Sequence, residues 1–454
     1  RGELYRISKP VDPEFEMAAL MEQIDQQRRA FIFENVIGAR FPVVGGLLNR
    51  IECFGWALGS TPGEPFDANH LDDRFEAAKR NLIAPREVPT APVKEVVRRG
   101  EQIDLPDLPV PTFFELDSGP FITAACGISR NPDTRQLNVG VYRTLILGRS
   151  TMAVNASSLS DLRKFYQHAE QRGESIPVAL AIGVEPALQM AATCKLPPDQ
   201  SEFNLAGGLQ GKPVDLIKCE TSDLLVPANA EMIIEAEVRF TSNIDNNLGE
   251  FAGQYGLETA PVAEVTAITH RKDAMFYSIL AGRNPEHNTL GSIATFSIRR
   301  ALIAALRSQL TGIVDIDVFL EPRMGAMAHI VMSIRKQNDA EPMALIDAAF
   351  RAAGGFFPVS HITKRIIVVD EDVNVHDLSD VEWAMYTRIA RADKYRVIPD
   401  IKSWELERCA KKDKGSLRLA IDATKDIQDR EDMLRPVIPG AGEIRLADYL
   451  QRKP

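Results

Sequence analysis

Two short stretches carry residues whose types and spacing can do acid–base chemistry on a carboxylate. The first, NVGVYR, runs from Asn138 to Arg143 and supplies a guanidinium and an amide that can bind a metal. The second, DNNLGE, runs from Asp245 to Glu250 and supplies two carboxylates five residues apart. If the stretches meet in space, one arginine faces two acids, and such a site can hold a substrate carboxylate and move a proton.

The local sequence gives this pairing little support by itself. Asn246, Asn247 and Gly249 lie between the two acids, a composition that predicts a turn or loop rather than a helix. An arginine in an apolar run is most often an edge-strand residue facing water, and loop acids are most often solvated. The chemistry therefore depends on whether the fold brings the two stretches together.

Other candidate residues are weak when taken singly. Glu231 lies near a strand start in VPANAEMIIEAEV, His287 lies in GRNPEHNTL, and Lys364 precedes IIVVD. Each has an ordinary interpretation as a solvated or strand-entry residue. The segment AGGLQGKP, residues 206–213, lacks the first glycine and the hydroxyl residue of a phosphate loop, and it predicts a hairpin between strands. G-x-G-x-x-G and H-E-x-x-H motifs are absent.

Composition bounds the class of protein. A chain of 454 residues predicts two or three domains. The formal net charge of -10 without a basic stripe argues against a nucleic-acid partner. We expect no membrane association, because no apolar run is long enough to span a bilayer and RGELYRISKPVDPEF lacks a signal-peptide core. The five cysteines form no C-x-x-C pair, which predicts a cytoplasmic protein.

The elements that must position these residues predict an α+β protein. A helix starting at Asp12-Pro13 and two strands predict an N-terminal α/β unit, and the proline-rich segment 105–112 predicts a boundary. Short strands between residues 121 and 276, interrupted by a helix over 160–172, predict a barrel or sandwich. A helical rod over 292–310 precedes alternating strands and helices, and the tail after residue 411 predicts no regular structure.

The order of these segments resembles the UbiD-like family of decarboxylases, which use prenylated FMN. The resemblance rests on GELYRISKPVDPEF, NVGVYR, AGGLQGKPVDLIKCETSDLLVPANAE, LGEFAGQYG, GRNPEHNTLG and RIIVVDEDVNVHDLSD, in that order. It implies four parts: an N-terminal α/β segment (1–110), a split β-barrel that binds the cofactor (111–291), a linker helix (292–312) and a C-terminal α/β oligomerisation domain with its tail (313–454).

The resemblance also implies a catalytic set of one arginine and two glutamates. The arginine matches Arg143, and the proton donor matches Glu250. The first glutamate position falls on Asp245, which keeps the charge but is one methylene shorter. It implies that Arg143 holds the substrate carboxylate, that Asp245 orients Arg143, and that Glu250 gives a proton to carbon. An acid in a dry pocket suits that last task.

A divalent metal, Mn²⁺ or Mg²⁺, bridges the cofactor phosphate to the protein in this family. Its ligands match Asn138 and Glu231, and the family's histidine falls on Asp161, whose carboxylate can replace it. A potassium ion beside the metal corresponds to the stretch with Thr221 and Asp223. The implied cofactor contacts are Asn138, Arg143, Glu231 and Lys364.

The implied activity is the reversible, non-oxidative decarboxylation of an aromatic, heteroaromatic or α,β-unsaturated carboxylic acid. The implied partners are a prenyl-FMN synthase that supplies the cofactor and further copies of the chain, as a homodimer or higher homo-oligomer. Two alternatives stay open at this point. One is a polyprenyl-hydroxybenzoate decarboxylase of quinone biosynthesis. The other is an inactive flavin-binding subunit, which the aspartate at 245 and the missing metal histidine keep possible.

Overall fold

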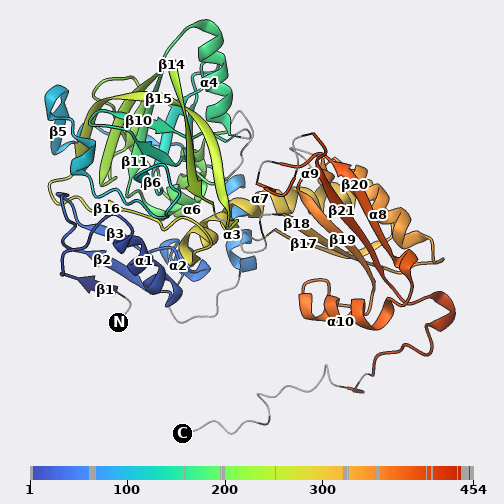
Figure 1. Ribbon diagram of the computed structural model, residues 1–454. Coiled ribbons are helices and arrows are strands. Elements are labelled where there is room, and N and C mark those ends of the chain that lie inside the picture. The colour runs from blue at the N-terminus through green and yellow to red at the C-terminus, as the bar shows by residue number, and fades with distance from the viewer. Residues whose placement is uncertain are drawn as a thin grey trace. The chain divides into compact units, whose positions relative to one another are not determined.

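The computed structural model forms two compact units, each described here by itself (Figure 1). The first unit comprises Arg1–Arg300, Leu320–Met327 and Leu406–Arg408, and the second comprises Ala301–Phe319, Ala328–Glu405 and Cys409–Pro454. The structure describes residues 4–60, 68–157, 160–194, 196, 200–250, 252–320, 325, 327–353, 358–404, 406–410, 413–436, 438–440 and 449.

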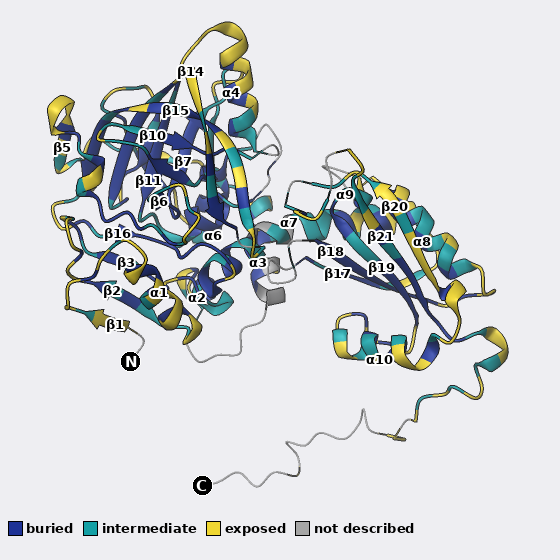
Figure 2. Ribbon diagram, viewed as in Figure 1, coloured by how far each residue is buried: buried dark blue, intermediate teal, exposed yellow. Residues whose placement is uncertain are grey.

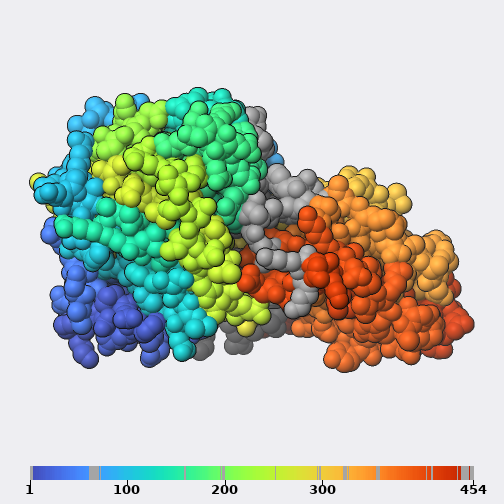
Figure 3. Space-filling model, turned by 45° about the horizontal axis from the view of Figure 1, so that its top comes forward, coloured from blue at the N-terminus to red at the C-terminus, as the bar shows by residue number. Residues whose placement is uncertain are grey.

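The N-terminal part of the first unit is a small sheet of order β1-β2-β3-β16, with helix α1 (Glu16–Gln26) packed on it. Its strands are Leu4–Ile7, Ala30–Phe33, Val43–Gly45 and Phe276–Tyr277. Helix α1 buries Met17, Met21 and Ile24, as the helical spacing predicts, but it begins at Glu16 rather than at Asp12-Pro13. In the space-filling view the blue N-terminal segment lies against cyan residues of the same unit (Figure 3). Glu14 forms an isolated parallel β-bridge with Thr112.

A curled nine-stranded sheet forms the main part of the first unit and confirms the α+β class (Figure 1). Its order is β6-β9-β10-β15-β14-β11-β7-β8, and β5 pairs with β15. The long hairpin β14–β15 dominates the sheet, and large parts of its strands are buried (Figure 2). Strands β5 to β11 are, in order, Val96–Arg99, Phe121–Ile122, Cys126–Arg130, Leu137–Val141, Thr144–Ile146, Thr151–Val154 and Ile176–Ile182. Strand β14 is Met232–Gly249, and strand β15 is Tyr255–His270.

Two segments predicted from Gly and Asn content have a different structure. Residues 245–249, predicted as a turn, are the end of β14, because every one of them pairs with β15. Residues 206–213, predicted as a hairpin, begin inside helix α6 (Glu202–Gln210). A Cβ at Gly207 would lie 2.4 Å from the carbonyl oxygen of Ile83. The glycines therefore permit close helix packing rather than a turn.

The remaining elements of the first unit surround this sheet. Helix α4 begins as predicted, with the Ser160 hydroxyl accepting from the N–H of Arg163, and it ends at the left-handed Gly173. Helices α2–α5 are Ile51–Ala57, Ala68–Arg80, Asp161–Arg172 and Pro186–Ala191. Strands β4, β12 and β13 are Arg86–Glu87, Asp215–Lys218 and Leu225–Pro227, and 3-10 helices η1–η3 are Pro92–Lys94, Gly100–Gln102 and Leu105–Asp107.

Helix α7 (Pro285–Gln309) contributes residues to both units. By length and composition it is the one helix, among the residues searched, that is apolar enough to cross a membrane. One such helix is weak evidence for a membrane span, because core helices meet the same criteria.

The second unit is a five-stranded sheet of order β17-β18-β19-β21-β20, with the three central strands parallel and both edges antiparallel. Strand β21 lies in the tail that the sequence predicts as irregular, and that prediction is wrong because the strand is buried between β19 and β20. Helix α10 packs on one face through Val381 and Ala384. Strands β17 to β21 are Ile313–Phe319, Ala328–Ile334, Thr363–Asp370, Tyr395–Ile401 and Ser416–Ala423. Helices α8 to α10 are Glu341–Arg351, Val359–Ile362 and Leu378–Arg388. The 3-10 helices η5 and η6 are Ala392–Lys394 and Ile427–Asp429.

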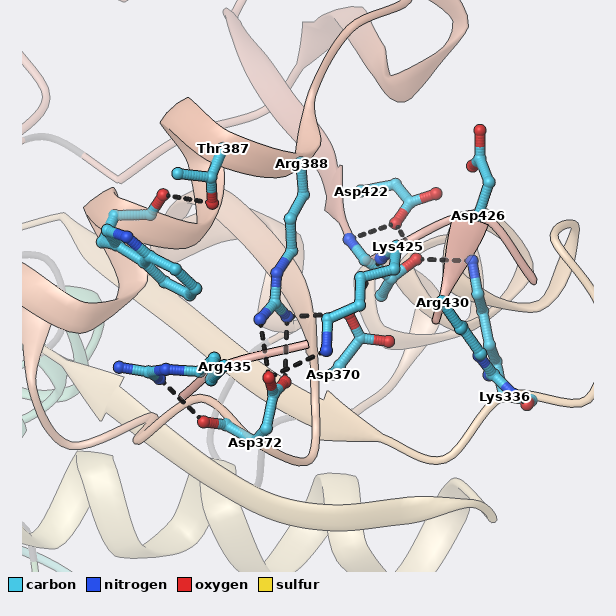
Figure 4. A network of polar contacts seen from close by, with 12 residues as sticks. Lys336, Asp370, Asp372, Thr387, Arg388, Asp422, Lys425, Asp426, Arg430 and Arg435 are labelled. Atoms are coloured by element: carbon cyan, nitrogen blue, oxygen red, sulfur yellow. Dashed lines mark hydrogen bonds and ion pairs between the residues drawn. The ribbon is translucent and has the colours of Figure 1, made fainter. Parts of the chain in front are cut away.

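Charged side chains gather beyond the carboxyl ends of β19 and β21 (Figure 4). The side chain of Arg388 is 1% exposed and donates to Asp370 at 2.7 Å and to both oxygens of Asp372 at 3.0 and 2.8 Å. Lys425 donates to Asp372 at 2.9 Å through its ammonium and to Asp370 at 2.8 Å through its backbone N–H. These opposite charges offset one another, which lets the cluster stay largely buried.

His376 contacts a carboxylate with each ring nitrogen. Its Nδ1 lies 2.8 Å from Asp317 Oδ2, and its Nε2 lies 3.0 Å from Asp315 Oδ2. The other oxygen of Asp315, Oδ1, accepts from Arg307. Burial alone would lower the pKa of His376. The hydrogen bonds to Asp317 and Asp315, together with the negative charges of these two residues, outweigh the effect of burial and raise the pKa. Because the folded protein binds the proton of His376 more tightly than the unfolded chain, the charged imidazolium stabilises the folded state below the ordinary pKa of about 6.5. This stabilisation is lost as the pH rises through the raised pKa.

We therefore expect His376→Gln to lower the melting temperature most at pH 5.5 and progressively less toward pH 8.5. Glutamine can hydrogen-bond one aspartate, but it carries no charge at any pH. Melting curves of wild type and variant across this range test the expectation. A difference in melting temperature that grows with pH would show that the imidazolium contributes nothing.

Candidate active site

The structure brings Arg143 and Glu250 together in a partly buried site. Arg143 follows β8, and its carbonyl accepts from the N–H of Asn155 at 3.0 Å. Its Nη1 donates to Glu250, and its Nη2 donates to Glu258 Oε1 at 3.0 Å. The exposed fractions of the three side chains are 18%, 6% and 16%. One guanidinium thus lies between two carboxylates that are mostly shielded from solvent.

Glu250 directly follows the last residue of β14, where the hairpin turns back. Its N–H donates to the carbonyl of Gln254 at 2.8 Å, which fixes the backbone at this point. A Cβ at Gly256 on the facing strand would lie 2.7 Å from Glu250 Oε1. Only glycine at this position leaves the carboxylate its place beside Arg143.

The predicted contact between Asp245 and Arg143 is wrong. Asp245 is exposed, and it accepts from the hydroxyl of Thr259 at 2.5 Å. Successive side chains of a strand point to opposite faces, so Asp245 lies on the face opposite to its buried neighbour Asn246. Glu258 is the cross-strand partner of Asn246 and shares its face. Glu258 therefore provides the second carboxylate on Arg143, a role that the family resemblance assigned to Asp245.

His287 is a further member of this site. It lies in the first turn of α7 and is partly buried. Burial lowers the pKa of His287 to about 4, with the positive charge of Arg143 acting in the same direction and the Glu250 carboxylate opposing. A neutral imidazole is therefore held close to the Arg143–Glu250 pair at neutral pH.

The adjacent residue Glu286 anchors the start of α7. Its carboxylate accepts from the N–H groups of Gly46 at 2.6 Å and Leu48 at 2.7 Å and from the Tyr277 hydroxyl at 2.8 Å. Burial and the charge of Asp25 raise the pKa of Glu286 to about 7. These bonds tie the first turn of α7, which carries His287, to the N-terminal part of the unit.

A second group of oxygen ligands lies around the hydroxyl of Tyr142. Asn138 donates to this hydroxyl at 3.3 Å through Nδ2. Burial raises the pKa of Tyr142, and the charges of Glu202 and Asp161 raise it further, which places both carboxylates nearby. Glu202 is 5% exposed and accepts from the N–H of Val139 at 2.9 Å. An amide and two carboxylates therefore gather near β8.

The prediction that Glu231 joins Asn138 is wrong. Through the ladders of β8, β7, β11 and β14, Asn138 is level with Ala236, five residues beyond Glu231. Five residues of strand correspond to about 16 Å along the sheet. Glu231 instead accepts from the N–H of Met275 at 3.0 Å and lies 3.9 Å from Arg271 Nε. Glu202 is the acid beside Asn138. It lies in the first turn of helix α6, a position that the sequence did not indicate because residues 206–213 predicted a hairpin.

The other predicted ion ligands bond neighbouring side chains. Asp161, whose charge acts on Tyr142, also accepts from Lys164 at 2.7 Å. Thr221 donates to the buried Glu235 at 2.8 Å, and Asp223 accepts from Arg135 at 2.6 Å. Among the residues that the structure describes, no group of three His, Cys, Asp or Glu side chains suits a metal ion. A metal near Asn138 would therefore depend on its amide oxygen as well as on carboxylates.

Lys364 lies in β19 of the second unit, where its ammonium donates to the hydroxyl of Ser416 at 3.0 Å. Its predicted contact with the cofactor stays a prediction.

Comparisons with known proteins match almost the whole chain. Three family models of 3-octaprenyl-4-hydroxybenzoate carboxy-lyase match this chain. The N-terminal domain model matches residues 1–68, the Rift-related domain model matches 86–284, and the C-terminal domain model matches 293–423. An uncharacterised protein, sll0936 of Synechocystis sp., is 30% identical over 456 residues, covering 95% of this chain and 89% of the relative.

Two solved structures have the same fold. The UbiD-class enzyme HmfF from Pelotomaculum thermopropionicum, in complex with FMN, is 34% identical, with a TM-score of 0.81 and coverage of 99% of this chain and 97% of that one. Vanillic acid decarboxylase from Sedimentibacter hydroxybenzoicus, in closed form, is 23% identical, with a TM-score of 0.81 and coverage of 97% and 94%. The second likeness concerns the fold alone.

Proposed function

The chain belongs to the UbiD family of carboxy-lyases, and from this membership we propose a decarboxylase that uses prenylated FMN. Its substrate is an aromatic, heteroaromatic or α,β-unsaturated carboxylic acid. The observation that carries the proposal is the partly buried Arg143 guanidinium between Glu250 and Glu258. A planar guanidinium is the side chain best suited to bind a carboxylate through two parallel bonds.

The burial and bonding of the two acids indicate which of them gives the proton. Arg143 is bonded to both Glu250 and Glu258. The Glu250 side chain is the less exposed of the two, at 6% against 16% for Glu258. We assign to Glu250 the proton that replaces carbon dioxide on the reacting carbon. Glu258 orients Arg143 from the other side.

The residues near Tyr142 fit the phosphate end of a flavin through a metal. HmfF has been solved with FMN and, in an evolved dimeric form, with prenylated FMN. Asp161 and Glu202 would repel a phosphate, and a divalent cation between them would remove that repulsion. Oxygen ligands from Asn138, Asp161 and Glu202 suit Mn²⁺ or Mg²⁺. When bound, prenylated FMN supplies the electron sink that no side chain offers.

The direct test is production of the protein together with a prenyl-FMN synthase, followed by an absorbance spectrum, a metal analysis and incubation with a panel of acids. The panel contains furoic, cinnamic, hydroxybenzoic and prenylated hydroxybenzoic acids. We expect a modified flavin spectrum and release of carbon dioxide from at least one class. Full cofactor loading without turnover of any acid, and without hydrogen–deuterium exchange into the corresponding products, would contradict the proposal.

We further propose a homo-oligomer in solution and a prenyl-FMN synthase as the supplier of cofactor. Related UbiD-class structures include a dimeric form, which supports self-association in this family. We propose that the C-terminal part expected at residues 313–454, most of which lies in the second unit, carries this self-association.

A matched pair of variants tests which acid holds Arg143. We expect Glu258→Gln to lower kcat/KM by about 10- to 100-fold, because a charge-assisted bond to a guanidinium contributes about 1.5–3 kcal/mol. Asp245→Asn, on the exposed face of the same hairpin, should change kcat/KM less than about twofold. Steady-state kinetics of both variants with equal cofactor content decide the matter. A strong loss of kcat/KM in Asp245→Asn, together with an unchanged kcat/KM in Glu258→Gln, would show that Asp245 rather than Glu258 holds Arg143.

A further inference from the structure

The loop of residues 113–118 is bonded to the end of β14 along its length. The N–H of Ser118 donates to the carbonyl of Asn247 at 2.9 Å, and the Ser118 hydroxyl accepts from the N–H of Asn247 at 2.8 Å. The Asn247 amide donates to the carbonyl of Leu116 at 2.8 Å. The loop thus continues the pairing of β14 on the side away from β15, up to the residue before Glu250.

Asp117 is the centre of this contact. Its Oδ2 accepts from the N–H groups of Phe114 at 2.9 Å and Phe113 at 3.3 Å, which closes the loop on itself. Its Oδ1 accepts from the N–H of Gly249 at 3.1 Å. One carboxylate therefore joins the loop to the residue that immediately precedes Glu250. Bonds of backbone N–H groups to a carboxylate are roughly twice as strong as bonds between neutral groups.

Phe114 extends the same loop to the other arm of the site. A Cβ at Gly249 would lie 2.5 Å from its ring, and a Cβ at Gly282 would lie 2.9 Å from it. Gly282 has a backbone hydrogen bond with His287. The ring also meets Tyr255 edge-on, with centroids 6.4 Å apart, and the Tyr255 hydroxyl accepts from the N–H of Leu116 at 3.2 Å. The loop therefore touches both the segment that carries Glu250 and the segment that carries His287.

We propose that the 113–118 loop is a positioning element for the proton donor and that Asp117 is its positioning residue. The inference rests on the proposed function only in naming Glu250 as the donor. Asp117 does not touch the reacting atoms. It holds Gly249, and so the Glu250 carboxylate, at the distance at which Arg143 is bonded. Proton transfer requires such placement, because small misplacements of a reacting group cost large factors in rate.

Asp117→Asn tests the proposal. Asparagine has one acceptor oxygen and presents an amide N–H group where the carboxylate accepts, so it cannot serve both Phe114 and Gly249. We expect kcat to fall about 10-fold or more with KM within about twofold, because substrate still meets Arg143. Hydrogen–deuterium exchange read by mass spectrometry should show faster exchange of the amides of Gly249 and Glu250, with the melting temperature within a few degrees of wild type.

Two further variants keep the test decisive. Asn247→Ala removes contacts of the same loop from the strand side and should give the same exchange pattern and the same loss of kcat. Glu115→Gln changes an exposed acid in the same loop and should match wild type in exchange and kinetics. Unchanged exchange at Gly249 and Glu250 in both Asp117→Asn and Asn247→Ala would overturn the proposal, as would a loss of kcat in Glu115→Gln equal to theirs.

The exchange measurement is independent of turnover. If wild type decarboxylates none of the acids offered, the proposed function fails, whereas faster exchange in Asp117→Asn still supports the positioning of Glu250. If wild type is active and the exchange is unchanged, the positioning role fails alone.

Discussion

Glu250→Gln is expected to lower kcat by about 10²- to 10⁴-fold, the usual range for loss of a positioned general acid. Glutamine has nearly the shape of glutamate, and its amide oxygen can still accept from Arg143 Nη1, so the substrate carboxylate should still find an ordered guanidinium. What the variant lacks is the carboxylic proton. The loss should therefore appear in kcat, with cofactor content and KM close to those of wild type.

The measurement is single-turnover decarboxylation by cofactor-loaded protein, with deuterium incorporation into the product as a second readout. Asp245→Asn is the matched control, since it makes the same change five residues earlier, on the exposed face of the strand. Near-normal rates in Glu250→Gln would show that another group gives the proton. His287 and Glu258 would then be the residues to substitute.

Arg388→Leu is expected to destabilise the second unit by about 3–5 kcal/mol, because removal of one partner leaves buried charge without compensation. Arg388 is 1% exposed at its side chain and bonds both Asp370 and Asp372. Without it, Lys425 is left as the cation bonded to these two acids in the network of Figure 4. Leucine fills part of the volume but offers no donor.

Chemical unfolding followed by tryptophan fluorescence measures this change, because the ring of Trp383 lies 5.1 Å from the Arg388 guanidinium carbon. Arg335→Leu is the control. It removes an arginine that pairs with Glu371 on the surface, where solvent screens the pair, and it should leave the unfolding midpoint nearly unchanged. Equal midpoints for Arg388→Leu and wild type would show that the buried network does not stabilise the unit.

The sequence by itself determined the class of fold and several of its regular elements. Residues 160–172 predict a helix with Ser160 at its start, and the structure has α4 with that cap. The apolar stretches at 178–182 and 214–219 predict strands, and the structure has β11 at Ile176–Ile182 and β12 at Asp215–Lys218. These features are local, since capping hydroxyls and apolar periodicity act within a few residues. The order of the quoted motifs was also sufficient to indicate the family and to bring Arg143 and Glu250 forward as a pair.

The tertiary structure alone decided which acids join them. The family resemblance assigned Asp245 to Arg143 and Glu231 to Asn138, and no local pattern brought Glu258 or Glu202 forward. The register of β14 against β15 turns Asp245 to the exposed face and Glu258 to the face of Asn246. The ladders from β8 to β14 carry Glu231 five residues away from the level of Asn138 and leave Glu202, on a packed helix, beside it. A shift of one residue in register exchanges the two faces of a strand, and register is set by contacts between distant segments.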